Sequence, residues 1–527
     1  MSWNALSHRS AAHSARFIGV SCWVICTLAL LGTLWVPEYL PFTDYPVHLT
    51  LIQATTTPSQ SLPATPNYFD THWLTPYAIP YQVGRIIASV TPIEMTGKIL
   101  LSLYILLTPI SFARLLHAMN SPRTIALGVF PLLLNFNVSW GFLPFLIAIP
   151  LILETITCAI RFQTTPSPHR WLALATLLIC LFFNHLFGLI TATALILAIS
   201  IPGVPRPPRT CMWTIFSLIP AGLMTILWRK SLQFSAADAV FLQKGIRFAP
   251  LSLKLRFLPD YIVSGDPGNL SRAIFLSTCI VMLLRALPTR QYRAEQTTGH
   301  STGKPFHTTA VALSTGILVL YLLCPYSWLT AVWLFNRLAF FLPMTALCLL
   351  PARSRLPDRA WIPVMTLLTL WLGIHATQRH LQFSDEARPG IQALHRIPPG
   401  QALRFLPSDS RSRFTDHEPY THFGQYYVLR QHGFVINPFA TLVHMPVQYT
   451  PEWMAVFAGF RLNLSHTGGV LQANLGPEWH DYYLLRLLPS DTPDTVLPLF
   501  HTLASPPSVL YHTGPWLLLS SPRSPSS

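Results

Sequence analysis

The sequence predicts an α-helical polytopic membrane protein with about eleven transmembrane helices and a small C-terminal soluble domain of mixed α/β structure. The first observation is charge depletion: the 527 residues are 51% hydrophobic and only 10% charged, whereas soluble domains carry roughly 25% charged residues. The second is a series of long apolar runs, which continues as far as Arg379. After that residue the sequence mixes charged, aromatic, proline and glycine residues, which is typical of a soluble domain.

The apolar runs are expected to form helices, because a backbone in hydrocarbon must satisfy its own hydrogen bonds. Two long stretches, 122–160 and 171–201, are interpreted as hairpins of two helices each. Polar residues and glycine lie at their midpoints, 135–141 and 184–188, and favour turns near one membrane face. The candidate spans are 17–36, 97–116, 122–135, 139–160, 171–184, 186–201, 211–229, 270–287, 308–324, 331–350 and 361–378.

The distribution of basic residues predicts the orientation. With a cytoplasmic N-terminus, the segments inside carry nearly twice as many Lys and Arg residues as those outside, in agreement with the positive-inside rule. The first apolar run follows the basic residues Arg9 and Arg16 and has no small-x-small cleavage site, so it is interpreted as an uncleaved span. An odd number of spans places the C-terminal domain outside the cytoplasm.

Residues 1–379 are therefore predicted to form the transmembrane domain, with a long first external loop at 37–96. Residues 380–527 are predicted to form an extracytoplasmic soluble domain with a disordered Ser/Pro-rich tail at 520–527. The net charge of +15 is dispersed between apolar runs, which argues against nucleic-acid binding. The eight cysteines lie in or beside apolar runs without metal-type spacing and are interpreted as buried apolar residues.

Chemistry is expected at the start of the first external loop. Asp44 lies just beyond the first span, in the segment Thr43-Asp44-Tyr45-Pro46. A partly desolvated carboxylate at a membrane surface can have a raised pKa and act as a general base. The alternative interpretation is a helix N-cap, because Pro suits the first turn of the helix that would follow. The two roles are compatible.

His48 is expected to orient Asp44. It lies four residues later, on the same face of the expected helix. An Asp/His pair at this spacing could also ligate a metal, but nothing nearby completes a ligand set. Orientation by a hydrogen bond is favoured, and the prediction for the site is that it contains no metal. A divalent metal at this site stays an open alternative, although the sequence gives no support for it.

The segment Asp44-Tyr-Pro-Val-His48-Leu49 resembles the start of the first external loop in bacterial GT-C-type membrane glycosyltransferases, which use polyprenyl-phosphate-linked sugars. Two further segments, Asn184-His185-Leu-Phe-Gly188 and Phe335-Asn336-Arg337-Leu-Ala-Phe340, resemble family motifs at the same membrane face. The resemblance covers roughly residues 17–380. Many family members carry an adjacent Asp-Glu pair in this loop, and here Tyr45 follows Asp44.

The resemblance implies that Asp44 is the general base of an inverting sugar transfer at the extracytoplasmic face. Arg337, an ionisable residue in an apolar run, would stabilise the departing lipid phosphate, and the alternative is that it extends to the outer interface. His185 would line the cavity or bind donor phosphate, or serve as a structural hydrogen-bonding residue. Arg247 and Arg256, in an unusually basic external loop, are weaker candidates for phosphate binding, as are Lys244 and Lys254.

The implied partners are membrane lipid, a polyprenyl-phosphate-linked sugar as donor, and a glycan, lipid or protein as acceptor. The expected location is the bacterial inner membrane. Two alternatives stay open: a transporter or flippase for a lipid-linked solute, and a non-catalytic membrane assembly protein. No GxxxxGK[ST] phosphate-binding loop and no HExxH motif is present in the sequence, which argues against soluble-type NTPase and zincin chemistry.

Overall fold

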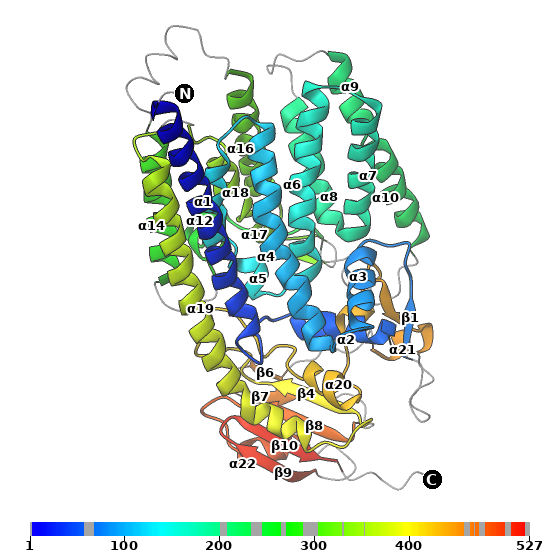
Figure 1. The fold of residues 1–527 in the computed structure, drawn as a ribbon. Coiled ribbons are helices and arrows are strands. Elements are labelled where there is room, and N and C mark those ends of the chain that lie inside the picture. Colours follow the sequence, from blue (N-terminus) through cyan, green and yellow to red (C-terminus); the bar gives the residue numbers. More distant parts are fainter. Residues whose placement is uncertain are drawn as a thin grey trace.

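A bundle of apolar helices forms one part of the structure, and a strand-containing C-terminal region lies at one end of it (Figure 1). The computed structural model describes residues 3–56, 68–200, 208–232, 245–264, 270–287, 304–328, 331–351, 354–457, 464–467, 470–473, 480–500 and 507–521. The N-terminus lies at the end of the bundle remote from the C-terminal region (Figure 1). The long helix α19 (Asp358–His395) connects the two parts.

The apolar runs are largely helical, but the run 122–135 is a 3₁₀ helix, and the runs 211–229 and 331–350 are each broken into two helices. Charged residues are rare in them, so their side chains pack against one another or face outward as apolar surface. The helices of the bundle, besides α19, are α1 (Trp3–Trp35), α4 (Ile93–Ala118), the 3₁₀ helix η1 (Arg123–Leu132), α5 (Phe136–Ser139), α6 (Leu143–Thr164), α7 (Pro168–Asn184), α8 (Leu186–Ser200), α9 (Pro208–Phe216), α10 (Ile219–Ser231), α12 (Leu251–Arg256), α13 (Leu258–Ile262), α14 (Leu270–Ala286), α16 (Lys304–Leu323), α17 (Leu334–Leu338) and α18 (Phe341–Leu347).

Five helical segments in the described part of the chain are long and apolar enough to cross a membrane. They are Ile18–Trp35, Ile93–Ala118, Leu143–Thr164, Pro208–Ser231 and Asp358–His395. Five shorter apolar helical segments accompany them: Arg123–Leu132, Pro168–Asn184, Leu186–Ser200, Thr308–Leu323 and Leu334–Leu347. A mostly helical fold with several candidate membrane-spanning helices and a strand-containing C-terminal region is confirmed, and the count of eleven spans stays a prediction.

Residues 37–96, which are predicted to form the first external loop, pack against the C-terminal region. They contain α2 (Tyr45–Thr56), β1 (Phe69–Thr71) and α3 (Ala78–Ala88). Strand β1 pairs antiparallel with β5 (Val447–Tyr449), with Phe69 opposite Tyr449, and α2 packs against α20 (Gln425–Gln431). Segments separated by more than three hundred residues therefore form one layer at this end of the bundle (Figure 1).

The C-terminal region is built on a four-stranded sheet in the order β4-β8-β10-β9. Strand β4 runs parallel to β8, and the other two pairs are antiparallel. Its strands are β4 (Leu403–Pro407), β8 (Tyr482–Arg486), β9 (Ser508–Thr513) and β10 (Trp516–Ser520). The smaller elements are η2 (Pro438–Thr441), α21 (Pro451–Phe457), β6 (Leu464–Thr467), β7 (Val470–Ala473), α22 (Pro493–Val496) and η3 (Leu497–Phe500), and a hairpin of β2 (Ser327–Trp328) and β3 (Ala331–Val332) lies in the bundle.

Two predicted boundaries fall within elements of the structure. The domain boundary at 379/380 falls inside α19, because composition changes where the helix leaves the apolar bundle, whereas its backbone hydrogen bonding continues to His395. Gly390 lets β10 pack on this extension, since a Cβ there would lie 2.6 Å from the Trp516 ring. The disordered tail predicted at 520–527 begins too early, because Ser520 pairs with Tyr482 in the sheet. Residues 522–527 lie outside the described residues.

Candidate functional site

Asp44 lies immediately before α2 and is held by the turn at 139–141. The Asp44 N–H donates to the carbonyl of Trp140 at 2.9 Å, and the Asp44 carbonyl accepts from the His48 N–H at 3.1 Å. Gly141 permits this close approach: its φ is +70°, and a Cβ there would lie 2.7 Å from the Tyr45 nitrogen. Both the left-handed conformation and the contact require glycine. The position of Asp44 thus depends on the predicted turn between two apolar helices.

Arg337 and His185 are in direct contact. His185 lies at the break between α7 and α8 and is buried. Arg337 lies in α17, and its Nη1 is 3.1 Å from His185 Nε2. Since a guanidinium can only donate, Nε2 is the acceptor nitrogen of the imidazole. The Arg337 guanidinium also lies 4.0 Å from the centre of the Phe142 ring, and its buried Nε has no partner among the described residues.

His48 does not pair with Asp44, contrary to the prediction. Its Nδ1 lies 2.6 Å from the hydroxyl of Tyr81 on α3, and both side chains are buried. The prediction fails because Asp44 precedes the helix. Its side chain therefore does not take the direction that brings residues four apart together on a helix.

Two histidines of the C-terminal region complete the cluster, and sequence reasoning missed both roles. His422 Nε2 lies 3.6 Å from Asp44 Oδ1, just beyond hydrogen-bonding distance. The His444 ring lies 5.2 Å from that of Tyr77, which itself packs on His185 at 4.7 Å. The Asp44–Arg337 cluster, as we name it, consists of Asp44, His48, Tyr77, Tyr81, His185, Arg337, His422 and His444.

Burial sets the ionisation of the Asp44–Arg337 cluster. Desolvation raises the pKa of Asp44 to about 7, and the positive charge of Arg337 opposes this shift. Burial lowers the pKa of His48 to about 3 and those of His422 and His444 to about 4. The charge of Arg337 adds to the lowering at His48 and His444. At neutral pH the cluster therefore combines neutral imidazoles, a half-ionised carboxyl group and one guanidinium within electrostatic reach of each other.

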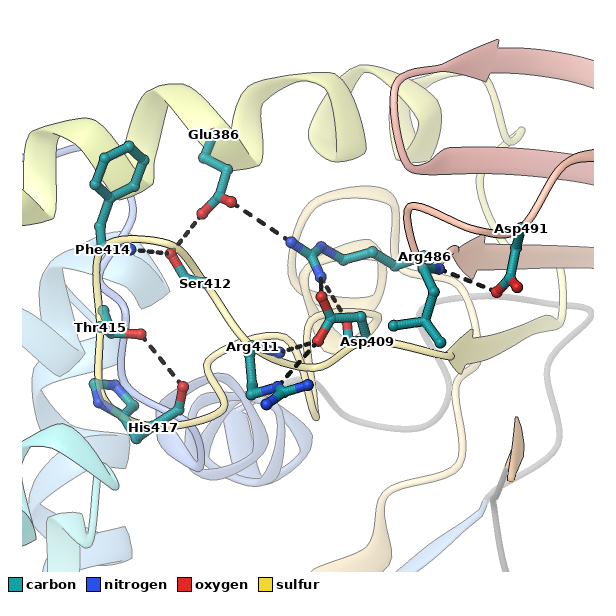
Figure 2. A network of polar contacts seen from close by, with 10 residues as sticks. Glu386, Asp409, Arg411, Ser412, Phe414, Thr415, His417, Arg486 and Asp491 are labelled. Atoms are coloured by element: carbon teal, nitrogen blue, oxygen red, sulfur yellow. Dashed lines mark hydrogen bonds and ion pairs between the residues drawn. The ribbon is translucent and has the colours of Figure 1, made fainter. Parts of the chain in front are cut away.

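The segment 408–417, which leads to His422, is tethered at several points (Figure 2). Ser412 Oγ donates to Glu386 of α19 and accepts from the Phe414 N–H. Arg486, at the end of β8, bridges Glu386 at 3.5 Å and Asp409 at 3.2 Å (Figure 2). His417 Nε2 hydrogen-bonds the carbonyl of Pro41. These contacts hold the segment that leads to His422 against α19 and against the segment that carries Asp44.

Replacing Arg486 by Gln is expected to destabilise the C-terminal region by about 3–5 kcal/mol, since Glu386 and Asp409 would lose a buried partner. Arg486 is almost fully buried, with 6% of its side chain exposed. The matched control is Arg411→Gln: Arg411 also contacts Asp409 but is 74% exposed, so its loss should cost about 0–1 kcal/mol. Denaturant unfolding followed by limited proteolysis at 408–424 measures both. Equal destabilisation by Arg486→Gln and Arg411→Gln would contradict the assignment of Arg486 as the residue that holds the segment 408–417 in place.

The remaining basic candidates do not join the Asp44–Arg337 cluster. Arg247 and Arg256 are exposed; Arg247 bonds Tyr326 and Ser327 through its backbone, and the Arg256 guanidinium lies over the Phe257 ring. Lys254 is buried, and its amine donates to the carbonyls of residues 321, 322 and 324 at the end of α16. Its role is to cap that helix. Lys244 lies outside the described residues.

Within the described ranges, no group of three or more His, Cys, Asp and Glu side chains has an arrangement that could hold a metal ion. Comparison of the sequence with models of known protein families finds no match, and comparison with curated proteins finds none either.

Proposed function

We propose that the chain is a membrane glycosyltransferase that moves a sugar from a polyprenyl-phosphate donor to an acceptor hydroxyl at the extracytoplasmic face. One observation carries the proposal. A carboxyl group with a pKa near 7, Asp44, lies within electrostatic reach of Arg337, which has no acidic partner among the described residues. A base that is half ionised at neutral pH suits proton abstraction, and a cation without a carboxylate partner suits an anionic leaving group.

The proposed reaction is a single displacement. The acceptor hydroxyl oxygen attacks the anomeric carbon and forms the new glycosidic bond, while its proton passes to the Asp44 carboxylate. The bond between the anomeric carbon and the phosphate oxygen breaks on the opposite face, and its electron pair leaves with the polyprenyl phosphate. Configuration at the anomeric carbon is therefore inverted. Arg337 would hold the phosphate, and the charge that develops there would be stabilised because the surroundings are poorly solvated.

The fold supports a lipid-linked donor. The Asp44–Arg337 cluster lies where apolar helices meet the first external loop and the C-terminal region, so a polyprenyl chain could remain in the bilayer while the sugar reaches the cluster. In the proposed topology the apolar helices cross the inner membrane eleven times, the N-terminus is cytoplasmic and the C-terminal region is periplasmic. The GT-C-type architecture belongs to the same proposal and is supported by the motif resemblance.

The transfer rate is expected to depend on the ionisation of Asp44. Its pKa of about 7 implies that the carboxylate, the form that accepts a proton, is lost as the pH falls. The rate should be close to its plateau above pH 8 and decrease about tenfold per pH unit below pH 6. Initial rates of the purified protein at saturating donor, measured from pH 5 to 9, test this expectation. A flat profile would assign proton abstraction to another group.

The proposal is tested by comparing cells that lack the protein with cells that express the wild-type chain or Asp44→Asn. Envelope glycans and lipids are analysed by mass spectrometry for one missing sugar, together with accumulation of the polyprenyl-phosphate donor. We expect both changes in the deletion strain and in the Asp44→Asn strain at equal protein level. Restoration of the sugar by Asp44→Asn would favour a transporter or an assembly protein instead.

A further inference from the structure

A second feature, at the opposite end of the bundle, is independent of the Asp44–Arg337 cluster. A cavity of about 440 Å³ opens where α1, α4, η1 and α6 meet, remote from the C-terminal region. Four basic side chains and two apolar ones are prominent in its lining: Arg114, His117, Arg123, Arg161, Trp23 and Ile110. The residues come from four elements of the bundle, so the cavity is a product of tertiary packing. We name it the basic cavity.

Positive charge in the basic cavity exceeds negative charge. Arg114 forms an ion pair with Glu154 at 3.0 Å. The guanidinium groups of Arg123 and Arg161 are without an ion-pair or hydrogen-bond partner among the described residues; Arg161 takes part in hydrogen bonds through its backbone carbonyl. The nearby carboxylate of Asp358 is already bound by Arg285 at 2.6 Å and by Thr124 at 3.0 Å. Two guanidinium groups without a partner among the described residues thus line one cavity.

The surface that leads away from the basic cavity is apolar. On α4, Leu107 and Ile110 are 43% and 45% exposed, and Arg114 follows on the same face at helical spacing. On the adjacent α1, Val24 and Leu28 are 49% and 61% exposed. Trp23 lies between the two environments, as tryptophan does at membrane interfaces. The basic groups thus lie at one end of an apolar strip on the helix surface. A phospholipid has the same order, with a polar headgroup followed by acyl chains.

We infer that the basic cavity binds the headgroup phosphate of an anionic glycerophospholipid, whose acyl chains lie along the exposed apolar faces of α1 and α4. Arg123 and Arg161 contact the phosphodiester, and Arg114 is held in the cavity wall by Glu154. A basic pocket between transmembrane helices is suited to this ligand class because the phosphate is attracted electrostatically while the chains stay in hydrocarbon. A soluble phosphate would gain only the electrostatic attraction, because it has no acyl chains to place in hydrocarbon.

The test measures binding of a fluorescent short-chain phosphatidylglycerol to the full-length chain in neutral-detergent micelles, by fluorescence anisotropy. Unlabelled phosphatidylglycerol should compete. Phosphatidylcholine should compete much more weakly, because its choline cation offsets the charge of the same phosphodiester, and inorganic phosphate at the same concentration should not compete. The double variant Arg123→Gln/Arg161→Gln should bind about 30-fold more weakly, because each arginine near a lipid phosphate contributes about fivefold. The control Arg209→Gln, an exposed arginine of α9 outside the basic cavity, should bind like the wild type.

Equal competition by phosphatidylcholine would overturn the inference, as would equal competition by inorganic phosphate, which would identify a soluble ligand. Binding that survives in the double variant would place the lipid elsewhere on the bundle. Circular dichroism spectra of the variants confirm that the helices are retained, so a loss of binding reports on the cavity. Because the basic cavity and Asp44 are at opposite ends of the bundle, failure of this inference leaves the transferase proposal unaffected.

Discussion

The Asp44→Asn variant is expected to lose glycosyl transfer by a factor of about 10²–10⁴, the usual contribution of a positioned general base. Asparagine keeps the size and polarity of the side chain but accepts no proton at neutral pH. The backbone contacts of residue 44 with Trp140 and His48 do not involve the side chain, so insertion and folding should be preserved. The measurement is the initial rate of sugar transfer by purified protein at matched concentration.

The control for this loss is Asp70→Asn, the same change in the same segment, residues 37–96. Asp70 is part of β1, where it pairs through its backbone with Gln448, and its side chain does not belong to the Asp44–Arg337 cluster. Its transfer rate should equal that of the wild type. A comparable loss in both variants would show that carboxylates of the loop act through structure or general charge, and not through Asp44 as a base.

The thermal stability of Asp44→Asn further distinguishes a role of Asp44 as general base from a structural role. The folded-state pKa of Asp44, about 7, is above its ordinary value of 3.8, so the folded protein retains a proton that the unfolded chain releases between these values. The contribution of Asp44 to stability therefore decreases as the pH rises to about 7. Asp44→Asn should raise the apparent melting temperature, and by more at pH 8 than at pH 5.

The Arg337→Gln variant is expected to weaken donor use by about 10²–10³-fold in kcat/KM, equivalent to about 2.7–4 kcal/mol of lost electrostatic stabilisation. Glutamine can still hydrogen-bond His185, but it carries no charge for the phosphate. Because Arg337 lowers the pKa of Asp44, the variant should also need a higher pH for half-maximal rate. A merely structural arginine would not shift the pH profile in this direction.

The control for Arg337 is Arg85→Gln, which removes an exposed arginine from α3 in the first external loop. Its donor dependence and pH profile should match those of the wild type. If Arg337→Gln kept wild-type donor dependence, the phosphate would have to be bound elsewhere. Arg247 and Arg256 would then be tested next, despite their exposure.

The helices could be predicted from the sequence because a run of apolar residues is a local property, and the bilayer leaves the backbone few alternatives. The proximity of His185 and Arg337 could also be predicted from the positions of the apolar runs. Both residues occur where an apolar run breaks or begins, so the alternation of spans places them at one end of the bundle. Gly141 and the turn before it were also visible in the sequence, as a polar interruption of a long apolar stretch.

The rest of the Asp44–Arg337 cluster depends on tertiary packing. His422 reaches Asp44 only because the β1–β5 pairing and the Arg486 tether bring the C-terminal region onto the first external loop. No periodicity or spacing connects residues 44 and 422. The prediction for His48 was wrong for a local reason, since the helix begins one residue after Asp44. The change of composition near residue 380 marks where the chain leaves the apolar helices, and it does not mark the end of α19, which continues to His395.

The most direct test of the proposed function is a cryo-electron microscopy structure of the protein bound to a non-transferable phosphonate analogue of a polyprenyl-phosphate sugar. Our account predicts the phosphonate oxygens within hydrogen-bonding distance of the Arg337 guanidinium, and the anomeric carbon facing the Asp44 carboxylate with room for an acceptor hydroxyl between them. Density for the phosphonate at another surface, with Asp44 and Arg337 both without contact to the analogue, would contradict it.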